Sequence, residues 1–445
     1  MIINIIRVNK NNIKLGTQPP AGTKDFLPYE AAVITESSRV LLNEFSKWGY
    51  KRVITPSVEL VDTLRISSDV NNLFKVVDVG SGELLSFRSD FTLQIGRLSS
   101  AVINSNVLPF KFSYCGPVLR NIDIVSGKHR EIWQAGVELI GPDSPESDAE
   151  LIVMAIESLK KLKIKDFNVD IGNVEFFKGI ISDLDEDISK KIEYCVVRKD
   201  VSSLTGILEN VNLSDKKKDI IKELPFMFGE EDIIKKAWKM ADNDRSKKAI
   251  ENIERIISYI KTYRLNDYIT VDLGEVRRLH YYTGTIFECY ASGIGYELLG
   301  GGRYNNLSKS FGQSYAGAGF AINLDIISEL LGINRTNVKH NEFVVANKTA
   351  DYVISVELNN FLKEAGYKSE INYMEYGYIE HIEYMKKNNI DNLVYIYNDK
   401  NNAEKEKNII SYQNIKDLSK INFYSLEEFK KYIINIHNEH ASETL

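Results

Sequence analysis

Cysteine is scarce in this chain of 445 residues, which contains only Cys115, Cys195 and Cys289. The three lie far apart, form no CxxC pair and are accompanied by no histidine-rich cluster. The sequence therefore predicts neither a zinc site nor a disulfide framework. Isolated thiols in an odd number are typical of a reducing compartment, where disulfides are rare.

Long apolar runs are also missing, so no segment of the sequence is predicted to span a membrane. The first residues, MIINIIRVNKNNIKLG, lack the extended apolar core and small-residue cleavage site of a secretory signal. We therefore expect a soluble, cytoplasmic protein that holds no metal.

Positive charge is in deficit, with 56 Lys and Arg against 62 Asp and Glu and a net charge of −6. Nonspecific binding of nucleic acid requires net neutralisation of phosphates, so this balance argues against a general polyanion binder. A hydrophobic fraction of 43% and a charged fraction of 27% are typical of a globular chain. The length predicts two or three domains.

The pattern along residues 1–333 mixes helices with strands. An amphipathic helix is predicted at 30–48, followed by a strand at 51–60 in which Pro56 favours an edge or interface position. A hairpin is predicted around residues 80–83. Residues 174–264 are rich in Lys and Glu and poor in strand signals, which indicates a helical insertion.

The C-terminal part has a different pattern. Residues 334–342 form a polar linker. From 343 the pattern is strand, helix, strand, helix and strand, ending with NLVYIYN at 392–398, which predicts a small α/β domain at 343–445. Residues 341–445 hold 17 Asp and Glu against 12 Lys and Arg, so this domain offers a poor surface for RNA.

Strand periodicity in EIWQAGVELI, residues 131–140, gives the first indication of a site. Alternate residues of a strand share a face, so Gln134 and Glu138 point the same way, with Gly136 leaving a gap between them. An unpaired buried Gln or Glu costs ~1–3 kcal/mol, so the pair is a plausible seat for a small polar ligand.

Other polar motifs allow two interpretations each. In FRSDFT, Arg88, Asp90 and Thr92 share a face at two-residue spacing, either as part of a pocket or because Arg88 and Asp90 pair structurally. GGGRYNNL is either a phosphate-binding cradle or a tight turn. A lone histidine such as His280 is more often structural, and an exposed basic triplet such as residues 128–130 is more often solvated. No Ser/His/Asp or Cys/His set can be assembled, so no catalytic residue is predicted.

Seven motifs together resemble the histidyl-tRNA synthetase family. They are GTKDFLPYE, WGYKRVITPSVEL, SFRSDFT, the strand pair at 116–141, RRLHYYTGTIFE, GGGRYNNL and AGAGFAINLD, in the order of that family, and the resemblance runs from about residue 16 to 330. It implies an α+β fold of the class II aminoacyl-tRNA synthetase type, in which helices flank an antiparallel sheet. The implied domains are 1–333 with the insertion at about 174–264, the linker 334–342, and a degenerate anticodon-binding domain at 343–445.

The family contains ATP-using ligases and a non-catalytic paralogue, the regulatory subunit of ATP phosphoribosyltransferase. In the ligases, an acidic residue that serves the adenine side of ATP lies two positions after the arginine that matches Arg120. This chain has Ile122 at that position. The ligases also carry an arginine that contacts ATP directly after the residue that matches Asp325, and this chain has Ile326 there. Hydrogen bonds to charged groups contribute ~1.5–3 kcal/mol each, so losing two weakens ATP binding by roughly 10² to 10⁴.

The positions that match the family's amino-acid pocket keep polar groups of the right type, although Asp90 is one methylene shorter than the family's glutamate. They are Asp90, Thr92, Arg120, Gln134, Glu138, Arg277, Tyr281, Tyr282 and Tyr304. The resemblance implies that Glu138 and a tyrosine hydroxyl hold the imidazole of histidine. It further implies that Asp90, Thr92 and Gln134 hold the amino group, and that Arg277 or Arg120 holds the carboxylate. Two departures bear on the pocket's backbone, Arg278 for a glycine and Asn305 for an aspartate.

A site that keeps the side chains for binding the amino acid and lacks those for binding the nucleotide is typical of a protein that senses the amino acid. The resemblance therefore implies a non-catalytic regulatory subunit that needs no cofactor, binds L-histidine and serves the short catalytic subunit of ATP phosphoribosyltransferase in the first step of histidine biosynthesis. It implies a homodimer through the motif that contains Pro56, within a hetero-octamer, and we expect no tRNA binding. The alternatives are an active histidine–tRNA ligase and a histidine-binding module for another partner.

Overall fold

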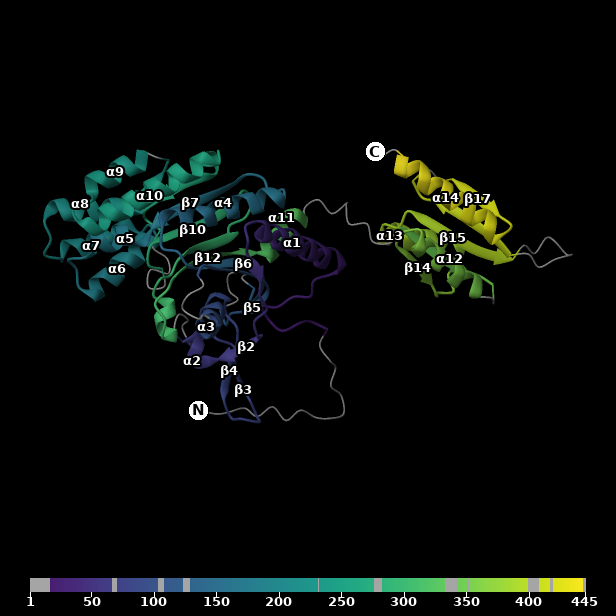
Figure 1. Ribbon diagram of the computed structural model, residues 1–445, viewed down its shortest axis with the longest axis horizontal. Helices are drawn as coiled ribbons and strands as arrows, with labels where there is room; N and C mark the ends of the chain where they lie inside the picture. Colours follow the sequence, from purple (N-terminus) through teal and green to yellow (C-terminus); the bar gives the residue numbers. More distant parts are fainter. Residues whose placement is uncertain are drawn as a thin grey trace. The chain divides into compact units, whose positions relative to one another are not determined.

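The computed structural model describes residues 17–65, 70–102, 108–122, 129–230, 232–275, 282–332, 342–349, 352–398, 408–416 and 419–442. Contacts divide the chain into two compact units, residues 1–334 and 335–445, each of which is described by itself (Figure 1). Within the described ranges, every helix is too short or too polar to cross a lipid bilayer.

Unit 1 is built on a large sheet, whose strand order within the described residues is β1-β5-β6-β12-β11-β10-β7-β9-β8. Neighbouring strands are antiparallel except at the pairs β1–β5 and β7–β9. The strands are β1 (Lys51–Arg52), β5 (Phe110–Leu119), β6 (Glu131–Gly141), β7 (Phe167–Asn173), β8 (Phe228–Gly229), β9 (Ile269–Asp272), β10 (Thr285–Ala291), β11 (Leu299–Arg303) and β12 (Ala316–Asn323). The expected α+β class, an antiparallel sheet flanked by helices, is confirmed.

Three helices cover one face of this sheet. They are α1 (Pro28–Lys47), α4 (Pro145–Lys161) and α11 (Leu324–Gly332), and their apolar sides meet alternate residues of β6, β12 and β10 in the main core. Helix α4 begins at Pro145 because Ser144 accepts a hydrogen bond from the Ser147 amide, 3.3 Å away. Helix α1 ends before Gly49, whose φ of +84° lies in the left-handed region that favours glycine.

A smaller sheet lies beside helix α3 (Thr92–Val102). Its strands β2 (Val58–Leu60), β4 (Leu84–Phe87) and β3 (Lys75–Val77) are antiparallel, and β3 and β4 form the hairpin predicted around residues 80–83. The single strand predicted at 51–60 is wrong, because β1 and β2 belong to different sheets and Pro56 lies between them. The short elements α2 (Val61–Leu64), η1 (Val70–Asn72) and η5 (Leu307–Phe311) complete this side.

The segment predicted as a helical insertion corresponds to six helices that gather beside β7 and β10 (Figure 1). Their apolar faces form a core of their own, in which Phe176 and Phe177 are fully buried. The helices are α5 (Val174–Ile180), α6 (Glu186–Val197), α7 (Val201–Glu209), α8 (Asp215–Glu223), α9 (Asp232–Met240) and α10 (Asp244–Thr262), with the turns η3 (Leu224–Phe226) and η4 (Asn266–Tyr268).

Unit 2 is a sheet of order β14-β13-β15-β16-β17 with helices on both faces. The strands are β13 (Phe343–Asn347), β14 (Ser369–Asn372), β15 (Asn392–Asn398), β16 (Asn408–Asn414) and β17 (Lys420–Phe423). The helices are α12 (Val353–Glu364), α13 (Tyr378–Asn388) and α14 (Leu426–Ser442). The first three strands in chain order are parallel, as in the predicted α/β pattern. The prediction missed β16, β17 and α14, because the polar run before residue 408 hides the short strands that follow it.

Candidate functional site

A cavity of about 590 Å³ opens on the face of the large sheet opposite α1 and α4. Its walls come from the turn between β4 and α3 and from strands β5, β6, β11 and β12. Seven of the predicted pocket residues line it: Asp90, Thr92, Arg120, Gln134, Glu138, Tyr282 and Tyr304. The other two, Arg277 and Tyr281, lie outside the described residues.

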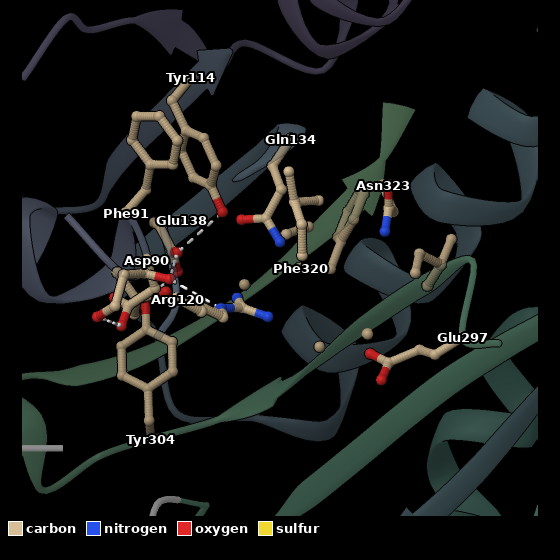
Figure 2. Close-up of a pocket in the computed structure, with 18 of the residues that line it drawn as sticks. Asp90, Phe91, Tyr114, Arg120, Gln134, Glu138, Glu297, Tyr304, Phe320 and Asn323 are labelled. Carbon is tan, nitrogen blue, oxygen red and sulfur yellow. Dashed lines mark hydrogen bonds between the residues drawn. The ribbon is translucent and has the colours of Figure 1, made fainter. Parts of the chain in front are cut away.

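Glu138 is the centre of one end of the cavity (Figure 2). Its side chain is buried, and three hydroxyl groups surround its carboxyl group. Thr92 Oγ1 donates to Glu138 Oε1 at 2.7 Å, Tyr114 OH lies 3.5 Å from the same oxygen, and Tyr304 OH donates to Oε2. Residues from three separate segments, α3, β5 and the turn after β11, therefore converge on one carboxyl group.

Burial raises the pKa of Glu138 to about 8, because the low dielectric of the cavity floor disfavours the charged form. The hydrogen bonds from Tyr304 and Thr92 act in the opposite direction, and the nearby charge of Asp90 raises the pKa further. The Glu138 carboxyl group thus holds a proton near neutral pH, so it can donate a hydrogen bond as well as accept one.

Glycines of β12 make room for this cluster. A Cβ atom on Gly319 would lie 2.0 Å from Glu138 Oε2, and one on Gly317 would lie 2.4 Å from the ring of Tyr304. Any side chain at either position would displace the carboxyl group or the ring. The glycines of the motif AGAGFAINLD therefore leave the space that the Glu138 carboxyl group and the Tyr304 ring occupy.

The prediction that Thr92 continues a strand with Arg88 and Asp90 is wrong. Strand β4 ends at Phe87, and Thr92 is the first residue of α3. Asp90 Oδ1 accepts a hydrogen bond from the Leu93 amide at 3.1 Å, as a helix-capping carboxylate does. Arg88 donates to the carbonyl oxygens of Pro117 and Thr55, so it supports the backbone instead of pairing with Asp90.

Tyr114 is a site residue that the sequence did not reveal. It lies on β5 directly opposite Gly136 of β6, and its hydroxyl group occupies the space above that glycine. The expected gap at Gly136 is therefore filled by Tyr114 and not by a ligand. A ring from a neighbouring strand could be assigned to this gap only after the register of β5 and β6 was known.

The other end of the cavity carries Gln134, Asn323 and Glu297, with Arg120 between the two ends (Figure 2). Gln134 is 9% exposed, and its amide makes no hydrogen bond to any residue that the structure describes. Arg120 Nε donates to the carbonyl oxygen of Ser89 at 3.0 Å, which holds the guanidinium group over the cavity. Amide and guanidinium groups thus face the open space.

The two positions that the resemblance matches to ATP-binding groups of the ligases, Ile122 and Ile326, are apolar. Ile122 lines the cavity, where it can neither donate nor accept a hydrogen bond through its side chain. Ile326 packs in the main core. Asp325 accepts a hydrogen bond from the Trp133 amide at 3.3 Å, and burial raises its pKa to about 6.

The glycine-rich motif GGGRYNNL is a strand, not a phosphate-binding loop. Residues 299–303 form β11 between β10 and β12, and Arg303 is buried in an ion pair with Asp148, 2.5 Å away. Arg303 also donates to the carbonyl oxygen of Pro142 at 2.9 Å. This arginine is engaged by the protein, so the interpretation as a phosphate cradle is wrong. In the described parts of the chain, no His, Cys, Asp and Glu side chains gather in a group that could hold a metal ion.

Comparison with known proteins identifies the class first. A model of the histidyl-tRNA synthetase family matches residues 22–327. The structure is similar to that of histidyl-tRNA synthetase from a Nostoc species, with a TM-score of 0.76 and 20% identity, covering 95% of this chain and 100% of that one. The class II, histidyl-tRNA synthetase-like fold expected from the sequence is thus confirmed.

The particular branch follows from a sequence relative, and a second solved structure shares the fold. A protein of Bacillus halodurans, described as an ATP phosphoribosyltransferase regulatory subunit/histidyl-tRNA synthetase, has a TM-score of 0.76 and 24% identity over 86% of this chain and 98% of its own. The ATP phosphoribosyltransferase regulatory subunit of Geobacter sulfurreducens is 36% identical over 78% of this chain and 81% of its own length. The chain belongs to the ATP phosphoribosyltransferase regulatory subunits within the histidyl-tRNA synthetase family. The Geobacter relative is named as a regulatory subunit and not as a ligase, which confirms the expectation of a non-catalytic member.

Proposed function

We propose that this chain binds L-histidine in the cavity around Glu138 and regulates a short-form catalytic subunit of ATP phosphoribosyltransferase in the first step of histidine biosynthesis. The observation that carries the proposal is the contrast within one cavity. A buried carboxyl group with three hydroxyl neighbours remains at one end, and apolar side chains stand where ligases bind ATP.

The Glu138 end suits an imidazole ring. Imidazole carries one nitrogen that donates and one that accepts, so it needs a partner of each kind. A Glu138 carboxyl group with a pKa of about 8 can take either role, and the tyrosine hydroxyl groups of Tyr304 and Tyr114 beside it can supply the other. Asp90, Thr92 and Gln134 would hold the amino group of the ligand, and Arg120, together with Arg277, would hold its carboxylate.

The apolar positions disfavour aminoacylation. Activation of an amino acid needs ATP held by charge-assisted hydrogen bonds, and Ile122 and Ile326 supply none. Arg303 is already neutralised by Asp148. The second candidate, an active histidine–tRNA ligase, is favoured by the shared fold and by the retained Arg120 and Arg277.

Regulation would couple the cavity to the active site of a separate chain. If bound histidine changes the affinity of the catalytic subunit for its substrates, those substrates must change the affinity for histidine by the same factor. The proposed coupling can therefore be measured either as the effect of histidine on substrate affinity or as the effect of the substrates on histidine affinity.

We further propose a homodimer through the segment that contains Pro56, within a hetero-octamer. The small sheet supports this proposal, because one of its faces carries only apolar side chains. Val58, Leu60 and Val76 are 38%, 44% and 39% exposed, and Leu85 and Phe87 complete the same face. An antiparallel sheet that faces water normally carries polar residues on that side, so a second copy of the chain is the expected cover.

Two measurements on the full-length chain test the proposal. Calorimetry should detect L-histidine binding, and Gln134→Ala should weaken it. Histidine-dependent exchange of pyrophosphate into ATP should be absent, while a bona fide histidyl-tRNA synthetase assayed in parallel shows it. Robust exchange would establish the ligase instead, and unchanged affinity in both Gln134→Ala and Glu138→Ala would remove the site.

A further inference from the structure

Unit 2 carries an apolar surface that has no role in the histidine site. The family match ends at residue 327, before this unit begins. Helix α12 starts just after strand β13, and the chain that leaves the neighbouring strand β14 runs beside it. Exposed apolar side chains gather there, at the carboxyl ends of two parallel strands. We call them the α12 patch: Tyr352, Val353, Val356, Tyr373 and Met374.

A ring contact and a hydrogen bond between the two loops join the two parts of the patch. The rings of Tyr352 and Tyr373 stack with centroids 6.4 Å apart. Val356 lies one helical turn after Tyr352 and therefore on the same side of α12. Lys348 donates to the carbonyl oxygen of Glu375 at 3.1 Å, which ties the loop after β13 to the loop after β14. The patch is thus a defined surface, not a set of unrelated side chains.

The exposure of these side chains is large for a free surface. Val353 is 64% exposed, Tyr373 69% and Met374 57%. Tyr and Met are enriched in protein–protein interfaces, whereas contiguous apolar patches are uncommon on surfaces that stay in water. An apolar partner surface would remove these side chains from water.

The charges around the patch specify the partner further. Glu357 and Glu375 are exposed at its border, and the ammonium group of Lys348 is directed to a backbone carbonyl. The whole region 341–445 has 17 acidic and 12 basic residues. This balance opposes RNA, which needs phosphates to be neutralised, and it complements a protein surface that is apolar at its centre and basic at its rim.

We propose that the α12 patch is a docking surface for the catalytic phosphoribosyltransferase chain, through an apolar area of that chain edged by Lys or Arg. This inference rests on the proposed function, because it takes its partner from there. It assigns unit 2 a role in assembly that is separate from histidine binding in unit 1.

The test uses the full-length chain and the separately purified catalytic chain. Tyr373→Asp and Val356→Asp should each weaken their association about ten-fold or more, measured by calorimetry or light scattering, and should leave histidine affinity unchanged. Tyr424→Asp is the matched control: this tyrosine is 55% exposed, but it follows β17 at the opposite edge of the same sheet, and its variant should bind as the wild type does.

The outcomes are distinct. Wild-type association that both patch variants retain overturns the docking surface and leaves the proposed function intact. Absence of association by the wild-type chain overturns both. Binding of tRNA by the wild-type chain that Tyr373→Asp abolishes shows that the patch is an RNA surface, which overturns the inference as well.

Discussion

The two ends of the cavity in unit 1 differ in how their polar groups are supported. At the Glu138 end, hydroxyl groups from α3, β5 and the turn after β11 converge on one buried carboxyl group. At the other end, Gln134 and Glu297 line the cavity, and Asn323 Oδ1 accepts a hydrogen bond from the Asp325 amide at 3.0 Å. A buried carboxyl group is costly unless it is hydrogen-bonded, so the cluster around Glu138 indicates a site under functional constraint.

The largest effect is expected from the ion pair between Arg303 and Asp148, which decides whether this arginine belongs to the fold or to a phosphate site. Asp148→Ala leaves a buried guanidinium group without its carboxylate, so the free energy of unfolding should fall by ~3–5 kcal/mol. Glu157→Ala on the same helix removes only the exposed pair with Lys160 and should cost less than ~1 kcal/mol. Urea unfolding of both variants measures the difference, and equal losses would contradict a structural role.

The next effect concerns the Glu138 end itself. Glu138→Ala removes the partner of three hydroxyl groups and of the ligand, and a buried polar group left without a partner costs ~1–3 kcal/mol, so histidine affinity should fall by roughly 5- to 150-fold. Glu138→Gln keeps an acceptor and the side-chain volume and should lose less. Calorimetry at fixed pH gives the histidine affinity of both variants. An alanine variant that binds histidine like the wild type would show that the Glu138 end does not hold the ligand.

Glu138 also predicts a dependence of stability on pH. Its pKa is about 8 in the folded chain and near the ordinary value of 4.5 when unfolded, so the folded state binds the extra proton between these values. The stabilising contribution is therefore complete below about pH 4.5 and is lost as the pH rises through about 8. Between pH 6 and 9 the thermal midpoint of the wild type should fall relative to that of Glu138→Gln. A constant difference between the two proteins would show that Glu138 does not titrate in this range.

The smallest effect is expected at Ile122. Ile122→Glu restores an acid at one position but supplies no arginine at 326, which packs in the core. Histidine affinity should fall less than in Glu138→Ala, since the Ile122 side chain makes no hydrogen bond that the change could remove. Pyrophosphate exchange should remain absent. Exchange gained by this single change would mean that the second end still holds the rest of an ATP site.

Much of the fold could be predicted from the sequence, because the signals concerned are local. Periodicity located α1 and β6, and the Lys- and Glu-rich pattern of residues 174–264 corresponds to α5 to α10. Errors arose where neighbours in sequence separate in space. Residues 51–60 divide between two sheets, and Thr92 leaves the strand pattern to start a helix. Local patterns report burial and period, and they do not report which sheet a short strand joins.

By itself the sequence determined which face of β6 carries Gln134 and Glu138, since side chains of a strand alternate. The resemblance to the ligases also led us to expect that Ile122 and Ile326 stand where ligases carry ATP-binding groups. Only the tertiary structure decided that Tyr304, Thr92 and Tyr114 meet Glu138, that Tyr114 fills the space above Gly136, and that Arg303 is paired with Asp148. The reason is physical: these contacts join residues far apart in the chain, and they exist only once strand order and register have been set by hydrogen bonds between strands.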